Sequence, residues 1–299
     1  MVKKNLLIVG NGYIASSFVN KFINKYNFII SSRNKNQLIK KSNISYIGNL
    51  LDKESNFDNR YGITDILFTA SASSFKKSNK LIVDNFISEF EFFLDKVNYT
   101  KIRNIIYLSS SSLYGTDKEN YSFHEEDLII KDTLYQKEKY YSEKILKKIF
   151  SGSKRNYKIL RISNPYGNIC SKIHKIGVIN KIFLNMIDGK KSIIKENGKP
   201  IRDYIFIDDL INYVDLAINS SSEQTKFNIG TGTGTSLENI MSLLKEADSR
   251  FDFILEKSKS KESNCSILDI SKAKKIFKYA PRYTIDKGLI YFKSSINKC

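Results

Sequence analysis

A glycine turn between an apolar strand and a helix constrains the fold more than any other feature of the sequence. The run Leu6–Gly10 is apolar, and the segment from about Tyr13 to Lys25 has the apolar spacing of a helix. Between them stands Gly10-Asn11-Gly12-Tyr13-Ile14-Ala15, a G-x-G-x-x-A pattern. In this strand–turn–helix setting the pattern predicts a dinucleotide site, with a plain glycine turn as the alternative.

The small residues of the turn have separate tasks in such a site. Gly10 permits the tight turn, Gly12 lets the backbone approach a pyrophosphate, and Ala15 lets helix and strand pack closely. The N–H groups at the start of the helix are free to bind phosphate. We therefore expect the cofactor to contact Gly10, Gly12, Tyr13 and Ile14.

Apolar runs alternate with helical stretches over the first part of the chain. The apolar runs are residues 28–32, 44–48, 65–70, 104–110 and 157–163, and the helical stretches include residues 81–96 and 134–150. This alternation favours an α/β fold with a doubly wound parallel (Rossmann) sheet, here at residues 1–167. Beyond Gly167 the elements are shorter and mixed, which predicts a smaller C-terminal domain at residues 168–299, with about 203–229 returning to the main sheet.

Charge and cysteine content narrow the range of partners. The formal net charge is +18, but the lysines are scattered and no nucleic-acid recognition motif is present. A basic solvated surface accounts for the charge, with a site for a phosphorylated ligand as the alternative. The 3 cysteines and 2 histidines lack metal-ligand spacing, so we expect no metal and free thiols in a reducing cytoplasm. The first apolar run is too short for a secretory signal or a membrane span.

The residue that follows the second apolar run bears on the ribose of the cofactor. A dinucleotide fingerprint has Asp or Glu there, bound to the 2′-hydroxyl. This chain has Arg33, and no acid lies between Phe28 and Leu38. A guanidinium suits a 2′-phosphate, and Ser31 or Ser32 would assist it. We therefore expect NAD(P), with NADP(H) slightly favoured, and an exposed loop arginine is the alternative.

Two tyrosines of the helical stretch 134–150 stand four residues ahead of a lysine: Tyr135 with Lys139, and Tyr140 with Lys144. Residues four apart share a helix face. A tyrosine with its usual pKa of ~10 is a poor base at neutral pH, but a nearby ammonium favours the phenolate. Such a tyrosine can exchange a proton while hydride moves to or from a nicotinamide. Spacing alone does not choose between the pairs, and two tyrosines on a solvated helix are the alternative.

The serine run Ser109–Ser112 ends a predicted central strand, where doubly wound sheets bind ligands. With Leu113-Tyr114-Gly115 it is similar to the motif S-S-x-x-V-Y-G, and Tyr135, Lys139 and Glu143 are similar to Y-x-x-x-K-x-x-x-E. Both motifs occur in the extended short-chain dehydrogenase/reductase family, the nucleotide-sugar epimerases, dehydratases and reductases. The chain resembles this family over almost its full length.

The resemblance implies a catalytic set. It selects Tyr135 over Tyr140 as the acid–base, with Lys139 tuning it and holding the nicotinamide ribose. It also implies that Ser110 polarises the sugar oxygen and that Ser111 contacts the substrate.

The resemblance also implies binding residues outside this set. Asn85 matches an Asn on the helix under the cofactor. Asn164, in the segment 161–167, matches an Asn that touches the nucleotide sugar, and Arg202 matches an Arg that holds the diphosphate. The C-terminal domain would then be the substrate domain, with the ligand in the cleft beside it.

Three departures from the family pattern affect the interpretation. The glycine loop is shorter than G-x-x-G-x-x-G and ends in Ala15, and Asn49 stands where an Asp usually meets the adenine. Dehydratases have an Asp-Glu pair directly after the catalytic hydroxyl, whereas this chain has Ser111-Ser112. Sugar 4,6-dehydration is therefore not expected.

The resemblance implies an NAD(P)-dependent nucleotide-sugar epimerase that oxidises and reduces a ring carbon, C4, in turn. One alternative is an NADPH-dependent nucleotide-4-ketosugar reductase, which Arg33 favours. Another is a non-catalytic NADP-binding regulator, against which the complete Ser–Tyr–Lys set argues. The partners expected are a nucleotide-diphosphate sugar and a second copy of the chain, through helices that include residues 81–96 and 134–150, with no nucleic acid.

Overall fold

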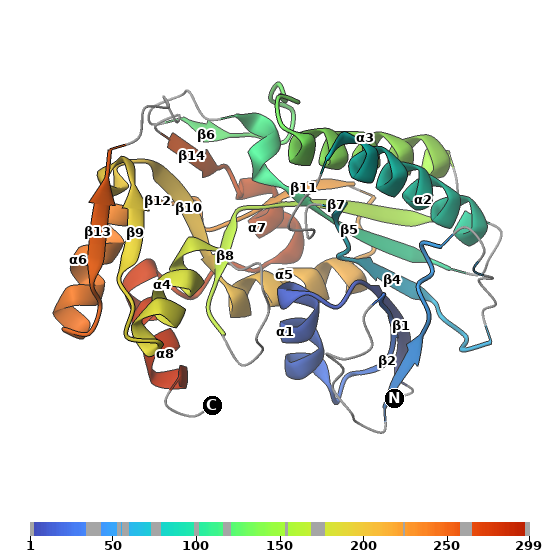
Figure 1. Cartoon of the computed structure of the whole chain (residues 1–299). Coiled ribbons are helices and arrows are strands. Elements are labelled where there is room, and N and C mark those ends of the chain that lie inside the picture. Colours follow the sequence, from blue (N-terminus) through green and yellow to red (C-terminus); the bar gives the residue numbers. More distant parts are fainter. Residues whose placement is uncertain are drawn as a thin grey trace. The chain divides into compact units, whose positions relative to one another are not determined.

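The main sheet has seven strands in the part of the chain that the structure describes, in the order β11-β7-β5-β4-β1-β2-β3 (Figure 1). β1 is parallel to both of its neighbours, β2 and β4, and the β2–β3 and β4–β5 pairs are also parallel. Chain order reverses across β1, as in a doubly wound sheet. The predicted Rossmann-type α/β fold is thereby confirmed. The strand bounds are β1 Lys4–Val9, β2 Tyr26–Ser31, β3 Ile44–Ile47, β4 Asp65–Phe68, β5 Asn104–Ser110, β7 Asn156–Ile162 and β11 Lys226–Ile229.

The computed structural model describes residues 3–33, 43–52, 55, 60–72, 79–98, 102–115, 121–152, 155–168, 177–223, 225–257 and 265–296. The chain divides into two compact units. The first is Met1–Leu113, Ile130–Leu160 and Val214–Phe227, and the second is Tyr114–Ile129, Arg161–Tyr213 and Asn228–Cys299. The domain boundary expected at residue 167 stays a prediction; in this division residues 114–129 and 161–167 group with the second unit, and residues 214–227 group with the first.

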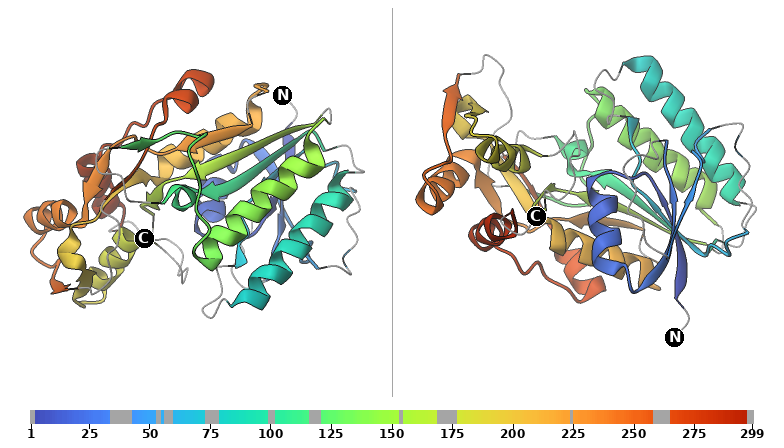
Figure 2. Two further views of the ribbon diagram at one scale, coloured as in Figure 1. Left: turned by 90° about the horizontal axis from the view of Figure 1, so that it is seen from above. Right: turned by 60° about the horizontal axis from the view of Figure 1, so that its bottom comes forward.

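Helices cover the main sheet because its strands are apolar on both faces. Leu6, Leu7 and Ile8 of β1 are 0 % exposed. Helices α2 (Lys80–Asn98) and α3 (Leu134–Phe150) lie side by side on one face, and α1 (Tyr13–Phe22) lies on the other (Figures 1 and 2). Phe68 on β4 packs against Phe90 on α2, with ring centres 4.6 Å apart. The bounds of α3 are those that the sequence predicts.

The second unit contains two smaller sheets. One has the order β12-β10-β14-β6, with β8 paired to β10, and the other pairs β13 with β9. Its strands are β6 Ser122–Phe123, β8 Asn164–Tyr166, β9 Ser192–Lys195, β10 Ile201–Phe206, β12 Gly234–Ser236, β13 Phe253–Glu256 and β14 Cys265–Leu268. Its helices are α4 Val178–Ile187, α6 Leu237–Ala247, α7 Ser271–Phe277 and α8 Ile285–Ile296, and α5 Ile207–Asn219 runs across the boundary into the first unit. Within the described residues, no helix combines the length and the apolar character that crossing a bilayer requires.

A fully buried lysine, Lys158, donates a hydrogen bond to the backbone just beyond the C-terminal end of α5. Lys158 on β7 is 0 % exposed, and its Nζ donates to the carbonyl of Ser220, 3.0 Å away, just beyond the helix. Cations are favoured at the carbonyl end of a helix dipole. Burial nevertheless lowers the pKa of Lys158 from 10.5 to about 8, because the charged ammonium has lost its water.

The buried Lys158 gives the stability a defined pH dependence. Its folded pKa lies below its unfolded value, so the unfolded chain binds more protons between pH 8 and 10.5 and stability rises over that window. Comparing wild type with Lys158→Met by urea unfolding, we expect wild type to gain up to about 3 kcal/mol relative to the variant from pH 8 to 10.5. The exposed Lys137→Met is the control and should show no such gain. A constant difference between wild type and Lys158→Met would contradict this account.

Candidate active site

The two glycines of the first turn are required for different reasons. Gly10 has φ +107, and a Cβ there would lie 2.7 Å from Thr69 Oγ1 and 2.9 Å from the Ala70 nitrogen. Gly12 has an ordinary φ of −87, and a Cβ there would meet nothing within 4 Å. Packing of β1 against the end of β4 therefore explains Gly10, whereas Gly12 borders open space at the start of α1. That space, with a helix start that has no acid in its first turn, fits a pyrophosphate.

The first of the two serines that precede Arg33 is part of the framework. Ser31 is 1 % exposed, and its Oγ donates to the Gly48 carbonyl and accepts from the Leu50 N–H, each at 3.0 Å. The hydroxyl thus joins β2 to the turn after β3 and has no free capacity for a phosphate. Of the residues expected around a 2′-phosphate, this leaves Ser32 and Arg33. The carboxylate of Glu89 on α2 acts electrostatically on the Arg33 guanidinium.

The four serines at the end of β5 differ in role: Ser109 is part of the core, whereas Ser110 and Ser111 are the candidate site residues. Ser109 donates to the carboxylate of Glu143 on α3, so it belongs to the core. Ser110 Oγ donates to Ser112 Oγ at 3.0 Å and accepts from the Ser112 N–H at 3.2 Å, which fixes its position at the strand end. Ser110 and Ser111 are 8 % and 7 % exposed. A short 3₁₀ turn, η3 (Ser111–Tyr114), follows.

Helix α3 begins with a capping box whose glutamine also bonds to η3, here called the serine turn (Ser111–Tyr114). Thr133 Oγ1 accepts from the Gln136 N–H at 3.2 Å, and Gln136 Oε1 accepts from the Thr133 N–H at 2.9 Å. Gln136 Nε2 donates to the Ser112 carbonyl at 2.8 Å. One glutamine therefore joins the start of α3 to the residues that follow β5.

The structure distinguishes the two tyrosine–lysine pairs. Lys139 is 4 % exposed and its Nζ donates to the Leu108 carbonyl at 3.1 Å and to Tyr107 Oη at 3.4 Å. The same Nζ lies 5.7 Å from the centre of the Tyr135 ring. Lys144 is exposed, with its Nζ 5.5 Å from the Tyr140 ring centre. The lysine of the first pair therefore bonds to β5, whereas the lysine of the second pair is exposed.

Burial and neighbouring groups act in opposite directions on Lys139. Desolvation lowers its pKa, but the Tyr107 hydroxyl and the Glu138 carboxylate, 3.5 Å from Nζ, together raise it above the usual value. Burial raises the pKa of Tyr107 to about 12, against the influence of Lys139. Lys139 therefore keeps its charge at neutral pH. Glu138 was not expected from the sequence, which contains no local sign that this residue of α3 is buried.

The remaining predicted residues lie elsewhere. Asn85 is exposed on α2, in the first unit. Asn164 and Arg202 belong to the second unit, where Asn164 Nδ2 donates to the Asp203 carbonyl at 3.0 Å and Arg202 Nη1 donates to the Ile201 carbonyl at 2.9 Å. Asp203 is 0 % exposed and accepts from the N–H groups of Thr231 and Gly232, so it orients the strand that carries Arg202.

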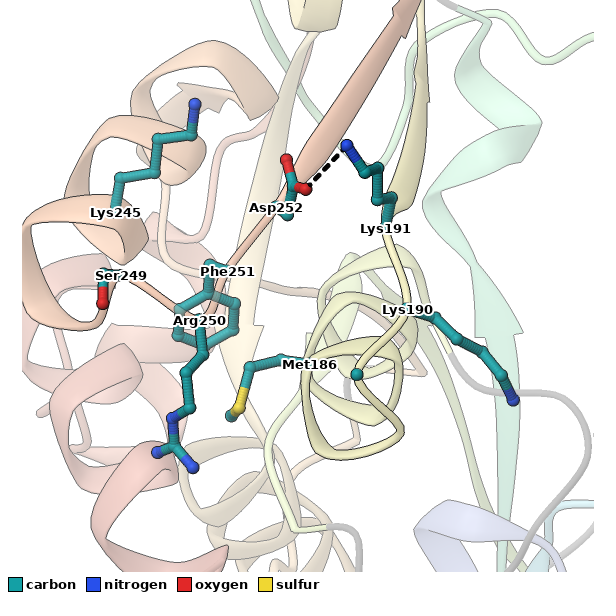
Figure 3. A pocket seen from close by; sticks show the side chains of 9 residues that line it. Met186, Lys190, Lys191, Lys245, Ser249, Arg250, Phe251 and Asp252 are labelled. Carbon is teal, nitrogen blue, oxygen red and sulfur yellow. Dashed lines mark ion pairs between the residues drawn. The ribbon is translucent and has the colours of Figure 1, made fainter.

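A cavity of about 670 Å³ in the second unit contains none of the predicted site residues (Figure 3). Its lining includes Lys190, Lys191, Lys245 and Arg250. Lys190, Lys245 and Arg250 point in different directions, and Lys191 is paired with Asp252 at 3.0 Å (Figure 3). Lys190 and Arg250 have carboxylates within 2.9 Å and 2.7 Å. Three of the four cations are thus paired with a carboxylate, and the four side chains do not converge on one point. The described residues contain no cluster of side chains that could hold a metal ion.

The fold and this arrangement of residues define a doubly wound α/β protein in which a half-buried tyrosine, Tyr135, lies next to a buried lysine, Lys139. A model of the NAD dependent epimerase/dehydratase family matches residues 6–230, and the chain belongs to this family.

Three comparisons show the range of related proteins. A putative UDP-glucose 4-epimerase of Methanocaldococcus jannaschii is 27% identical over 95% of this chain and 95% of its own length. A dTDP-D-glucose 4,6-dehydratase of Dictyostelium discoideum is 25% identical over 77% of this chain, which spans only 58% of that relative. The crystal structure of a UDP-glucose 4-epimerase from Thermotoga maritima with UDP-glucose has a TM-score of 0.87 at 24% identity, covering 98% of this chain and 99% of that one. The last likeness confirms the fold.

The capping glutamine provides a test of the link between α3 and the serine turn. Gln136→Ala loses the capping box and the bond to Ser112, and should lower the free energy of unfolding by about 1–2 kcal/mol. Gln136→Glu keeps the acceptor for the Thr133 N–H but loses the donor to Ser112, so we expect a smaller loss. Chemical denaturation of both variants measures this. Equal stability of Gln136→Ala and wild type would show that the link contributes nothing.

Proposed function

We propose that the protein is an NAD(P)-dependent nucleotide-sugar epimerase that acts by transient oxidation and reduction at C4. The observation that carries this proposal is the Tyr135–Lys139 pair, because its lysine is buried and bonded to the end of β5 while that of the Tyr140–Lys144 pair is exposed. Ser110, held at the same strand end, completes the set. Membership of the family supports it, because proteins named as epimerases are among the relatives.

The first unit offers the binding groups for the cofactor. The open side of Gly12 and the N-terminus of α1 receive the pyrophosphate, with Tyr13 and Ile14 beside it. Lys139 holds the nicotinamide ribose, and Asn85 lies under the cofactor. The cofactor, when bound, accepts hydride from the sugar and later returns it.

The residues of the chain then handle the proton. Tyr135, as phenolate, takes the proton of the C4 hydroxyl while the carbon loses hydride, and gives it back when hydride returns to the opposite face. The Lys139 ammonium favours the phenolate, and Ser110 donates to the sugar oxygen as it becomes a carbonyl. No net oxidation of the sugar results.

The second unit supplies the groups for the nucleotide. Arg202 is the residue for the diphosphate, because a guanidinium forms charge-assisted bonds to phosphate oxygens. Asn164 contacts the nucleotide sugar and Ser111 of the serine turn assists. We further propose that the chain works in the cytoplasm as a homodimer through α2 and α3, on which Leu81 and Tyr141 are 66% and 47% exposed.

Arg33 favours a second function, an NADPH-dependent nucleotide-4-ketosugar reductase. A reductase uses the same tyrosine, lysine and serine but donates hydride once and releases the oxidised cofactor. Its cofactor is NADPH, which the guanidinium of Arg33 would bind through the 2′-phosphate. A non-catalytic NADP-binding regulator is the third possibility, and it would have no use for the complete Ser–Tyr–Lys set.

The two tyrosines provide matched variants for the catalytic assignment. Purified protein is incubated with NAD and UDP-glucose, UDP-N-acetylglucosamine or UDP-glucuronic acid, and the 4-epimers are separated by chromatography. We expect Tyr135→Phe to lower turnover by about 100-fold or more, through loss of general acid–base catalysis, and Tyr140→Phe to leave it nearly unchanged. Equal losses in both variants would refute the role of Tyr135, and wild-type turnover of none of these sugars would count against the epimerase.

Cofactor preference tests Arg33. If its guanidinium binds a 2′-phosphate, wild type should bind NADP(H) more tightly than NAD(H), and Arg33→Asp should reverse the order. The change should be at least about 1.5–3 kcal/mol, the size of a charge-assisted hydrogen bond. Dissociation constants for both cofactors decide this. Equal affinity of the wild type for NAD and NADP would show that Arg33 is only a surface arginine without a role in cofactor choice. Consumption of NADPH in proportion to product would identify a reductase.

A further inference from the structure

A second buried charge stands next to Lys139 on α3. Glu138 is 0 % exposed, and its Oε1 lies 3.5 Å from Lys139 Nζ. Neighbouring residues on a helix point about 100° apart, so the burial of both requires cover over a wide arc of α3, which contacts both α2 and β5. Wholly buried carboxyl groups are rare unless they are paired with a cation. Lys139 is such a cation.

Of the surrounding carboxylates, Glu138 is the one that acts on the charge of Lys139. The groups that act on the Lys139 ammonium are Tyr107 from β5 and Glu138 and Tyr135 from α3 itself. Glu143, the other buried acid of α3, accepts from Ser109 on β5. On α2, Glu89 acts on Arg33 and Glu91 pairs with Lys148 at 3.1 Å.

We propose that Glu138 is a positioning residue: the buried counter-ion that holds Lys139 and limits the positive potential at the nicotinamide. This inference rests on the proposed function, in which Lys139 holds the nicotinamide ribose. The oxidised nicotinamide ring carries a positive charge and the reduced ring carries none. A full ammonium charge beside the ring disfavours the oxidised form, and a nearby carboxylate reduces that effect.

Glu138 thereby sets the relative affinity for the two forms of the cofactor. An epimerase needs both forms to stay bound within one turnover, because the hydride that leaves the sugar must return to it. Loss of the Glu138 charge should weaken the binding of the oxidised form and leave the reduced form nearly unchanged. A residue that only filled space in the helix packing would affect both forms equally.

The test compares dissociation constants of oxidised and reduced cofactor. NADH or NADPH fluorescence reports the reduced form, and competition with NAD or NADP reports the oxidised form. For Glu138→Gln we expect the ratio of oxidised to reduced dissociation constants to rise about fivefold. Glu138→Met, which replaces the charge with an apolar side chain of similar volume, should give the same rise. Glu138→Asp, which keeps the charge, should return the ratio toward that of wild type.

Glu91→Gln is the matched control, because Glu91 is a carboxylate of the neighbouring helix that pairs with an exposed lysine. Its ratio should equal that of wild type. An unchanged ratio in a folded Glu138→Gln or Glu138→Met variant would overturn this inference alone. Failure of wild type to bind either form of NAD or NADP would overturn the proposed function as well.

Discussion

The arrangement of the candidate site depends on one buried cation, the ammonium group of Lys139. Its 3.1 Å hydrogen bond to the Leu108 carbonyl joins α3 to strand β5, at the residue that precedes the serines. An ammonium without water must be compensated by neighbouring groups: its two hydrogen-bond acceptors come from β5, and a carboxylate of α3, that of Glu138, lies 3.5 Å away. These contacts fix the face of α3 that lies against β5. The same ammonium lies 5.7 Å from the Tyr135 ring centre, whereas the lysine next to Tyr140 is exposed.

The fold and helix α3 were accessible from the sequence because local signals agreed. Apolar spacing gave residues 134–150, and Thr133 with Gln136 formed a capping box at the predicted start. The glycine turn was recognisable because the apolar run before it and the helical spacing after it can both be read within a short stretch of sequence. The choice of Tyr135 over Tyr140 came only from resemblance to a family, since both tyrosines precede a lysine by the same interval.

Other features depended on contacts between distant segments. Ser31 seemed free to bind a phosphate, but the turn after β3 occupies its hydroxyl. Glu138 was not among the residues expected at the site, and only the folded chain shows that it is wholly buried beside Lys139. Both cases have one cause: a polar side chain in an apolar setting shows its partner only when the chain has folded. The elements of the second unit were difficult for a related reason, because their strands are short and pair out of chain order.

The contrast between Gly10 and Gly12 has an evolutionary consequence. A side chain at Gly10 would collide with Thr69 and Ala70, so selection for a folded protein suffices to retain the glycine. Among the described residues no neighbour requires Gly12, so its retention depends on what occupies the space outside. In a lineage that kept this fold but abandoned its ligand, the first glycine would persist and the second would drift. Comparing the two positions among relatives would therefore distinguish proteins that kept only the fold from proteins that also kept the ligand.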